Sequence, residues 1–196
     1  MTFTIYIAAG FVFVCCILFR HVLEADPVTH VLVQLPLLVW CGAVMASYVV
    51  NSKANWPEAN WNKTGIAPLL LAIFAAAFWM LPRSIDSAIT SPLMAVAKYI
   101  SLPLLVGVPL AIGWARAHPL LKGFLKAQSI SMLGVLAFLY THSPVRICNV
   151  YLVDDQVRLG TGFLVAAVAL AMIWTVPLLG VGTSRTAARV EVEKPI

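Results

Sequence analysis

The chain has 196 residues, of which 61% are hydrophobic and only 11% are charged, and its mean hydropathy is +0.92. A soluble domain usually carries about 25% charged residues, so this composition excludes an ordinary soluble fold and predicts an all-α integral membrane protein. The formal net charge of +5 comes from Lys and Arg residues spread over short connections, a pattern that follows membrane topology and disfavours nucleic-acid binding.

Six apolar segments approach the length of a membrane span, because about 20 helical residues cross the hydrocarbon core. Pro27 suits the first turn of the second helix, and Pro103 and Pro109 are expected to bend the fourth. The sequence predicts a bundle of six transmembrane helices within residues 1–181 and a flexible cytoplasmic tail at 182–196. The predicted spans are residues 4–19, 30–50, 66–81, 93–114, 127–141 and 159–180.

Basic residues are divided unequally between the two ends of this predicted bundle. With six spans both termini share one side, and cytoplasmic connections carry an excess of Lys and Arg. The side of the termini holds eight of them: Lys53, Lys63, Arg116, Lys122, Lys126, Arg185, Arg189 and Lys194. The opposite side holds Arg20, Arg83, Arg146 and Arg158, with Lys98 just inside the membrane. Both termini are therefore predicted to be cytoplasmic.

The outer end of the bundle gathers polar side chains of several kinds. Isolated charges inside a membrane are costly, so such a group is what a site would look like. Interfacial ion pairs, for example Arg83 with Asp154 or Asp155, explain the same residues as well, and Lys98 is expected to pair with Asp86. The residues are His21, Glu24, Asp26, His30, Arg83, Asp86, Lys98, Tyr99, His142, Arg146, Cys148, Asp154, Asp155 and Gln156.

Some side chains in and near this group are of the kinds that bind soft metal ions, namely Cys, Met and His. The candidate ligands are His30, Met80, His142 and Cys148. The polar residues around them would be Asp86, Lys98, Tyr99, Arg146, Asp155 and Gln156. Packing of Met80 and capping of helix ends by His142 and Asp155 are the structural alternatives. The chain has neither a nucleophile elbow nor an HExxH motif, so we do not expect an enzyme.

Four short features recur in an order typical of one family. Trp79-Met80-Leu81-Pro82 ends one helix with Asp86 following, and Lys98-Tyr99-Ile100-Ser101-Leu102 opens the next. Before them His30 leads through Gln34 to Pro36-Leu37-Leu38, and after them Asp154-Asp155-Gln156 precedes Leu159-Gly160. Over residues 30–180 the chain thus resembles the CtaG-type cytochrome c oxidase assembly proteins, as a short and divergent member. Two histidines of that family correspond here to Met80 and Tyr99, and its glutamate corresponds to Lys98.

The resemblance implies a role in placing copper in a haem–copper oxidase from the outer face of a bacterial inner membrane. The metal held by His30, Met80, His142 and Cys148 would then be copper, because Cu(I) accepts Cys, Met and His, often with only two or three ligands. We therefore expect a multi-pass protein that assists copper delivery to, or assembly of, a copper-dependent respiratory or oxidative enzyme. Its expected partners are the lipid bilayer and a larger membrane complex, with no nucleic acid. The alternative is a metal-free structural or accessory subunit of such a complex, which the replaced histidines favour.

Overall fold

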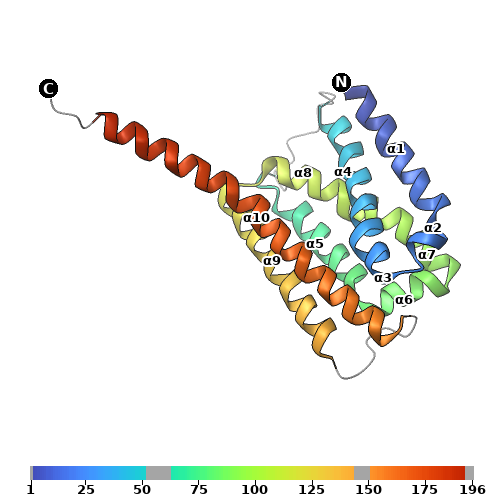
Figure 1. The fold of residues 1–196 in the computed structure, drawn as a ribbon. Helices are drawn as coiled ribbons and strands as arrows, with labels where there is room; N and C mark the ends of the chain where they lie inside the picture. The colour runs from blue at the N-terminus through green and yellow to red at the C-terminus, as the bar shows by residue number, and fades with distance from the viewer. Residues whose placement is uncertain (1, 52–62, 144–150, 193–196) are drawn as a thin grey trace.

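The structure, a computed structural model, describes residues 2–51, 63–143 and 151–192. Every regular element in this part of the chain is a helix, so the prediction of an all-α fold is confirmed there (Figure 1). By length and composition, four of the described helices could cross a membrane, and a bent pair could supply a fifth span. The four are Pro27–Ser47, Pro92–Arg116, Pro119–His142 and Asp154–Val176.

The N-terminal part of the chain forms two apolar helices joined by a short connection. Asp26 caps the second helix by accepting a hydrogen bond from the backbone N–H of Thr29 at 3.2 Å, and Pro27 occupies the first turn. The helix start predicted at Pro27 is therefore confirmed. The elements are α1 (Thr2–Leu18), α2 (Arg20–Leu23), α3 (Pro27–Thr29), the π-helical segment η1 (His30–Gln34) and α4 (Leu35–Asn51).

The middle of the chain contains a sharp bend. Helices α5 and α6 meet at 70°, where Leu81 is extended and Pro82 begins the new helix. The segment after Pro82, which the predicted spans left as a connection, is therefore helical, because a proline in the first turn starts a helix well. The elements are α5 (Ile66–Met80), α6 (Pro82–Thr90), α7 (Pro92–Ser101), the π-helical segment η3 (Leu102–Gly107) and α8 (Val108–Arg116).

The C-terminal part is a pair of long helices, α9 (Pro119–His142) and α10 (Val153–Val192). Helix α9 begins at Pro119, not at residue 127, because His118 caps it by accepting the backbone N–H of Leu120 at 3.3 Å. Lys122 and Lys126, predicted in a loop, therefore lie on this helix, and their ammonium groups approach tryptophan rings. Helix α10 continues to Val192, past the predicted end of the last span at residue 180.

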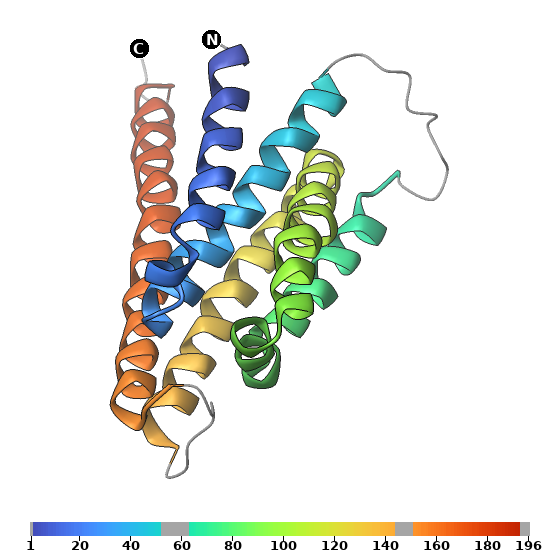
Figure 2. The same cartoon turned by 90° about the vertical axis from the view of Figure 1, so that its right-hand side faces the viewer.

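The helices are stacked so that the two termini point to the same end of the molecule, as Figure 2 shows. The connection between α1 and α3, helix α6 and the start of α10 lie at the opposite end. This placement groups the polar residues of those segments at one end of the bundle. It agrees with the arrangement expected from an even number of spans.

Helix α4 packs against η3 at short range. A Cβ atom on Gly42 would overlap the backbone of Pro103, and one on Gly107 would overlap the backbone of Val39. Both glycines are needed for this approach, because any side chain would push the two helices apart. The contact fixes the position of α7, which precedes η3.

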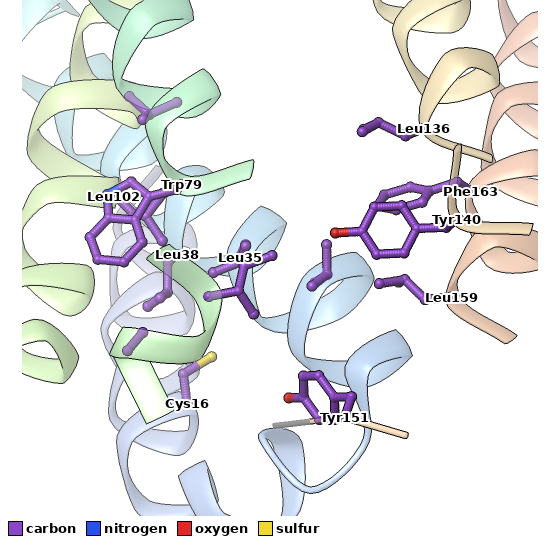
Figure 3. Close-up of a cluster of buried hydrophobic side chains, with 14 of the residues drawn as sticks. Cys16, Leu35, Leu38, Trp79, Leu102, Leu136, Tyr140, Tyr151, Leu159 and Phe163 are labelled. Carbon is purple, nitrogen blue, oxygen red and sulfur yellow. The ribbon is translucent and has the colours of Figure 1, made fainter. Parts of the chain in front are cut away.

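The buried apolar side chains form one cluster that connects α4, α5 and η3 with the α9–α10 pair (Figure 3). Leu38, Trp79 and Leu102 lie among α4, α5 and η3, and the Trp79 indole N–H donates to the Ser101 hydroxyl at 2.9 Å. Tyr140 and Phe163 pack edge to face between α9 and α10, with ring centroids 5.7 Å apart. The core thus fixes the two groups of helices whose ends carry the polar residues.

Candidate functional site

The end of the bundle opposite the two termini holds a buried polar cluster built around Lys98. We call it the Lys98 cluster. The side chain of Lys98 has no exposed surface, and it lies in α7 one to two turns from the end of the span. The cluster consists of Glu24, His30, Gln34, Lys98, Tyr99 and Tyr151.

The ammonium group of Lys98 has three acceptors around it. Its nitrogen lies 2.6 Å from Oε1 of Glu24, 3.1 Å from Oε1 of Gln34 and 3.2 Å from Nε2 of His30. An ammonium carries three N–H donors. Each donor therefore has a protein partner, which is what a buried charge requires.

Gln34 and Tyr99 extend this arrangement toward α1. The amide nitrogen of Gln34 donates to the Tyr99 hydroxyl at 2.8 Å and to the backbone carbonyl of Cys16 at 3.3 Å. The Tyr99 hydroxyl also lies 3.1 Å from that carbonyl and 3.3 Å from Oε1 of Glu24. The cluster therefore connects α1 with η1 and α7.

His30 has a partner on each ring nitrogen. Nδ1 lies 3.1 Å from the Tyr151 hydroxyl, which donates its single hydrogen to the backbone carbonyl of Glu24 at 2.9 Å. Nδ1 must then be the donor to Tyr151, and Nε2 accepts from Lys98. The contacts thus define a neutral His30 with its hydrogen on Nδ1.

The local backbone explains why these side chains meet. His30 and Gln34 are four residues apart in η1, so both face the same side of the helix. The wider π-helical turn changes the phase of the helix at this point, and such turns are common at functional sites. Glu24 comes from the connection that precedes the Asp26 cap. A second π-helical segment, η3, follows Lys98 and Tyr99 directly.

The donor set around His30 does not fit a copper ion. The lone pair of Nε2 points at an ammonium group, and Nδ1 carries a hydrogen, so neither nitrogen is free to bind a metal. The positive charge of Lys98 would also repel a cation at this distance. Within the described ranges, no three His, Cys, Asp or Glu side chains are grouped to hold a metal ion.

The other predicted ligands lie in different surroundings. Met80 ends α5 and packs, partly buried, against the apolar core. His142 is exposed at the end of α9, where its ring stacks on Phe138 at 4.5 Å. Its Nδ1 is 3.2 Å from the backbone carbonyl of Phe138, a contact typical of a helix end. Cys148 lies outside the described residues, as does Arg146.

Two of the polar residues expected around the copper belong to the Lys98 cluster, namely Lys98 and Tyr99. The expected pairing of Lys98 with Asp86 is wrong, because Glu24 reaches the ammonium instead and Asp86 is buried in α6. Gln156 is buried and donates to the backbone carbonyl of Tyr140 at 3.4 Å.

Asp155 has the capping role that its sequence position suggested. Its carboxylate accepts the backbone N–H of Leu152 at 3.3 Å, just before α10 begins. Arg158, and not Arg83, is the cation beside it, with Nη1 3.7 Å from Asp155 and 3.4 Å from Asp26. The exposed ion pair between Arg158 and Asp26 connects α10 to the start of α3, and such a pair contributes little to stability.

Glu24, Gln34 and Tyr151 are members of the cluster that the predicted site left out. A signal was present for two of them. Lysine inside an apolar span needs a carboxylate at the same end of the bundle, which Glu24 supplies, and glutamine inside a span needs a polar partner. Tyr151 carried no such signal, because its contact with His30 joins residues 121 positions apart.

The chain matches no protein-family model, no curated protein and no solved structure. The likeness to CtaG-type proteins therefore stays a prediction from the four short sequence features.

Proposed function

We propose that this chain is a six-span protein of a bacterial inner membrane that serves as a metal-free structural or accessory subunit of a larger membrane complex. Both termini lie in the cytoplasm in this proposal, and the Lys98 cluster lies at the outer end of the bundle. The proposal assigns the cluster a structural task. It holds α1, η1, α7 and the segment before α10 together, so that the bundle keeps one arrangement of its helices when a partner docks on it.

One observation carries the proposal. All three hydrogens of the Lys98 ammonium, and both nitrogens of His30, are used by protein groups. A site that binds a metal or a reactant keeps a position open for it. A closed cluster of fully paired groups instead favours one arrangement of the helices.

The apolar faces of α9 and α10 support docking on a larger complex. Only 17% of the apolar stretch of α9 and 22% of that of α10 is buried, compared with 44% for each of the spans Pro27–Ser47 and Pro92–Arg116. Phe138 and Val165 are among the large side chains that remain exposed. Membrane helices associate through packing of such faces, so this pair can accept neighbouring helices.

Copper delivery to a haem–copper oxidase, which the CtaG resemblance implies, is the competing function. Metal analysis of the detergent-purified chain, loaded with Cu(I) under reducing conditions and washed with a weak chelator, separates the two. We expect no retained copper, and we expect partner subunits to co-purify under mild extraction.

Two variants and two matched controls make this test specific. Met80→Ala and His142→Ala remove predicted ligands, whereas Met132→Ala and His118→Ala remove exposed residues of the same types elsewhere on the chain. The metal-free proposal would be overturned if the unmodified chain and the two control variants each retained about one copper while Met80→Ala and His142→Ala lost it. The proposal would be supported if removal of the chain prevented assembly of the complex whether or not copper was supplied.

A further inference from the structure

A groove with an almost entirely apolar lining runs between α1, α4 and the α7–η3 helix, and its cavity volume is about 660 Å³. It adjoins the Lys98 cluster at Tyr99, which belongs to the cluster and also lines the groove. Each helix supplies part of the wall. The wall residues used below are Gly10 and Phe13 of α1, Cys41 and Met45 of α4, and Tyr99 and Leu104 of α7–η3.

The groove is a consequence of how the three helices pack. The tight contact between Gly42 and Pro103 places α4 directly against η3 and closes the floor. Helix α1 contacts α4 where the Cys41 thiol donates to the backbone carbonyl of Ala9 at 3.3 Å. One residue further along α1 the groove is open, because a Cβ atom on Gly10 would meet nothing within 4 Å. It is closed again at Phe13, whose ring packs edge to face on Tyr99 with centroids 6.5 Å apart.

The chemistry of the walls selects an apolar occupant. Tyr99 lines the groove, but its hydroxyl bonds to Gln34 and to the backbone of Cys16 in the Lys98 cluster. The far side of α1 is also apolar, with Phe11 and Ile7 mostly exposed. A helix that is apolar all round is surrounded by lipid when nothing else covers it.

The size of the groove decides which apolar occupant fits. Its 660 Å³ lies in the range of about 300–1,000 Å³ that small-molecule pockets have. On α1 its lining runs only from Tyr6 to Phe13, which is about 10 Å of helix at 1.5 Å per residue. A membrane-spanning helix is about 30 Å long and packs along several turns, so this short groove suits a single hydrocarbon chain better than a partner's helix.

We propose that this groove binds one acyl chain of a membrane phospholipid. The proposal rests on the membrane location given under the proposed function, because only there does the groove open onto hydrocarbon. The bound chain would fill the space between α1 and α7 and complete the packing around Tyr99. It would thus support the Lys98 cluster from the side that no protein segment covers within the described residues.

Photolabelling tests the proposal on the full-length chain. The probe is a phosphatidylethanolamine that carries a diazirine near the middle of one palmitoyl chain, mixed into vesicles that hold the chain. After irradiation, mass spectrometry maps the labelled peptides. We expect labelling of α1, α4 and η3 at Phe13, Met45 and Leu104 to exceed labelling of the exposed faces of α9 and α10 several-fold.

Glycine variants supply the control. Gly10→Phe fills the groove from its open side, whereas Gly134→Phe places the same side chain in open space on α9, outside the groove. Met45→Trp fills the groove from α4. We expect Gly10→Phe and Met45→Trp to reduce groove labelling to the level of the other faces, and Gly134→Phe to leave it unchanged.

The outcomes separate this inference from the proposed function. Even labelling of all exposed apolar faces, unaffected by Gly10→Phe, would overturn the acyl-chain site and leave the membrane location intact. The same holds if α9 and α10 are labelled while the groove is protected, because a protein segment would then occupy it. Absence of labelling from every helix would overturn the membrane location itself.

Discussion

The ammonium nitrogen of Lys98 lies 2.6 Å from the carboxylate of Glu24, and the two residues are 74 positions apart in the chain. Their exposure differs, because the Lys98 side chain has no exposed surface and that of Glu24 has 12%. The pair therefore fastens the connection between α2 and α3 onto α7. It also makes the fully buried cation dependent on a partner that reaches the surface.

Glu24→Gln should destabilise the protein strongly. It keeps the size of the side chain but leaves the Lys98 ammonium buried without a counter-charge, and breaking a buried pair in this way costs about 3–5 kcal/mol. The measurement is the free energy of unfolding in detergent, followed by circular dichroism against denaturant. Arg158→Met, which breaks the exposed pair with Asp26, should change it by less than about 1 kcal/mol.

A double variant completes this experiment. Lys98→Met combined with Glu24→Gln removes both charges, and we expect it to recover most of the stability that Glu24→Gln loses. If Glu24→Gln were as stable as the unmodified chain, the ion pair would not hold the two segments together. A double variant as unstable as Glu24→Gln would show that the Lys98 ammonium matters through its hydrogen bonds to Gln34 and His30 and not only through its pairing with Glu24.

His30 should be a neutral imidazole with its hydrogen on Nδ1. The reason is that Tyr151 gives its hydrogen to the Glu24 carbonyl while Lys98 donates to Nε2. Nitrogen NMR of isotope-labelled histidine in detergent distinguishes the two tautomers, and loss of the signal in His30→Asn assigns it. Hydrogen on Nε2 would contradict the arrangement of the cluster.

Gly42→Ala should destabilise the bundle. The added methyl group overlaps the backbone of Pro103, and backbone cannot move aside as a flexible side chain can, so α4 and η3 must separate. The same substitution at Gly134, where a Cβ meets nothing within 4 Å, should stabilise the helix by about 0.5–1 kcal/mol. Melting temperatures of the two variants in one detergent give the comparison. Equal effects of both substitutions would count against the close packing.

The helices were predictable where local signals were strong. Pro27 marks the start of the second apolar helix, and the structure begins α3 at that proline. The start of α9 was missed, because Lys122 and Lys126 look like loop residues although their stems lie along the helix beside tryptophan rings. Helix α6 was missed because polar residues after Pro82 resemble a turn.

The site was predictable only in part. Its location at one end of the bundle, and the membership of His30 and Lys98, followed from polar residues in apolar segments. The partners did not follow, because the π-helical turn at His30–Gln34 alters which side chains face α7. Sequence spacing alone favoured Asp86 over Glu24 as the partner of Lys98. A contact between distant segments depends on the packing of the whole bundle.

The orientation of the bundle gives a final prediction, since it rests on the distribution of Lys and Arg. Lys63 lies just before α5 and Arg83 in the first turn of α6, so the two exposed residues are at opposite ends of α5. In a variant whose four native cysteines are replaced by alanine, we expect Arg83→Cys to react with a membrane-impermeant maleimide in intact cells whose outer membrane is permeabilised. We expect Lys63→Cys to react only after the inner membrane is opened, because its end of the bundle would face the cytoplasm. The reverse pattern would invert the topology and place the Lys98 cluster on the cytoplasmic side.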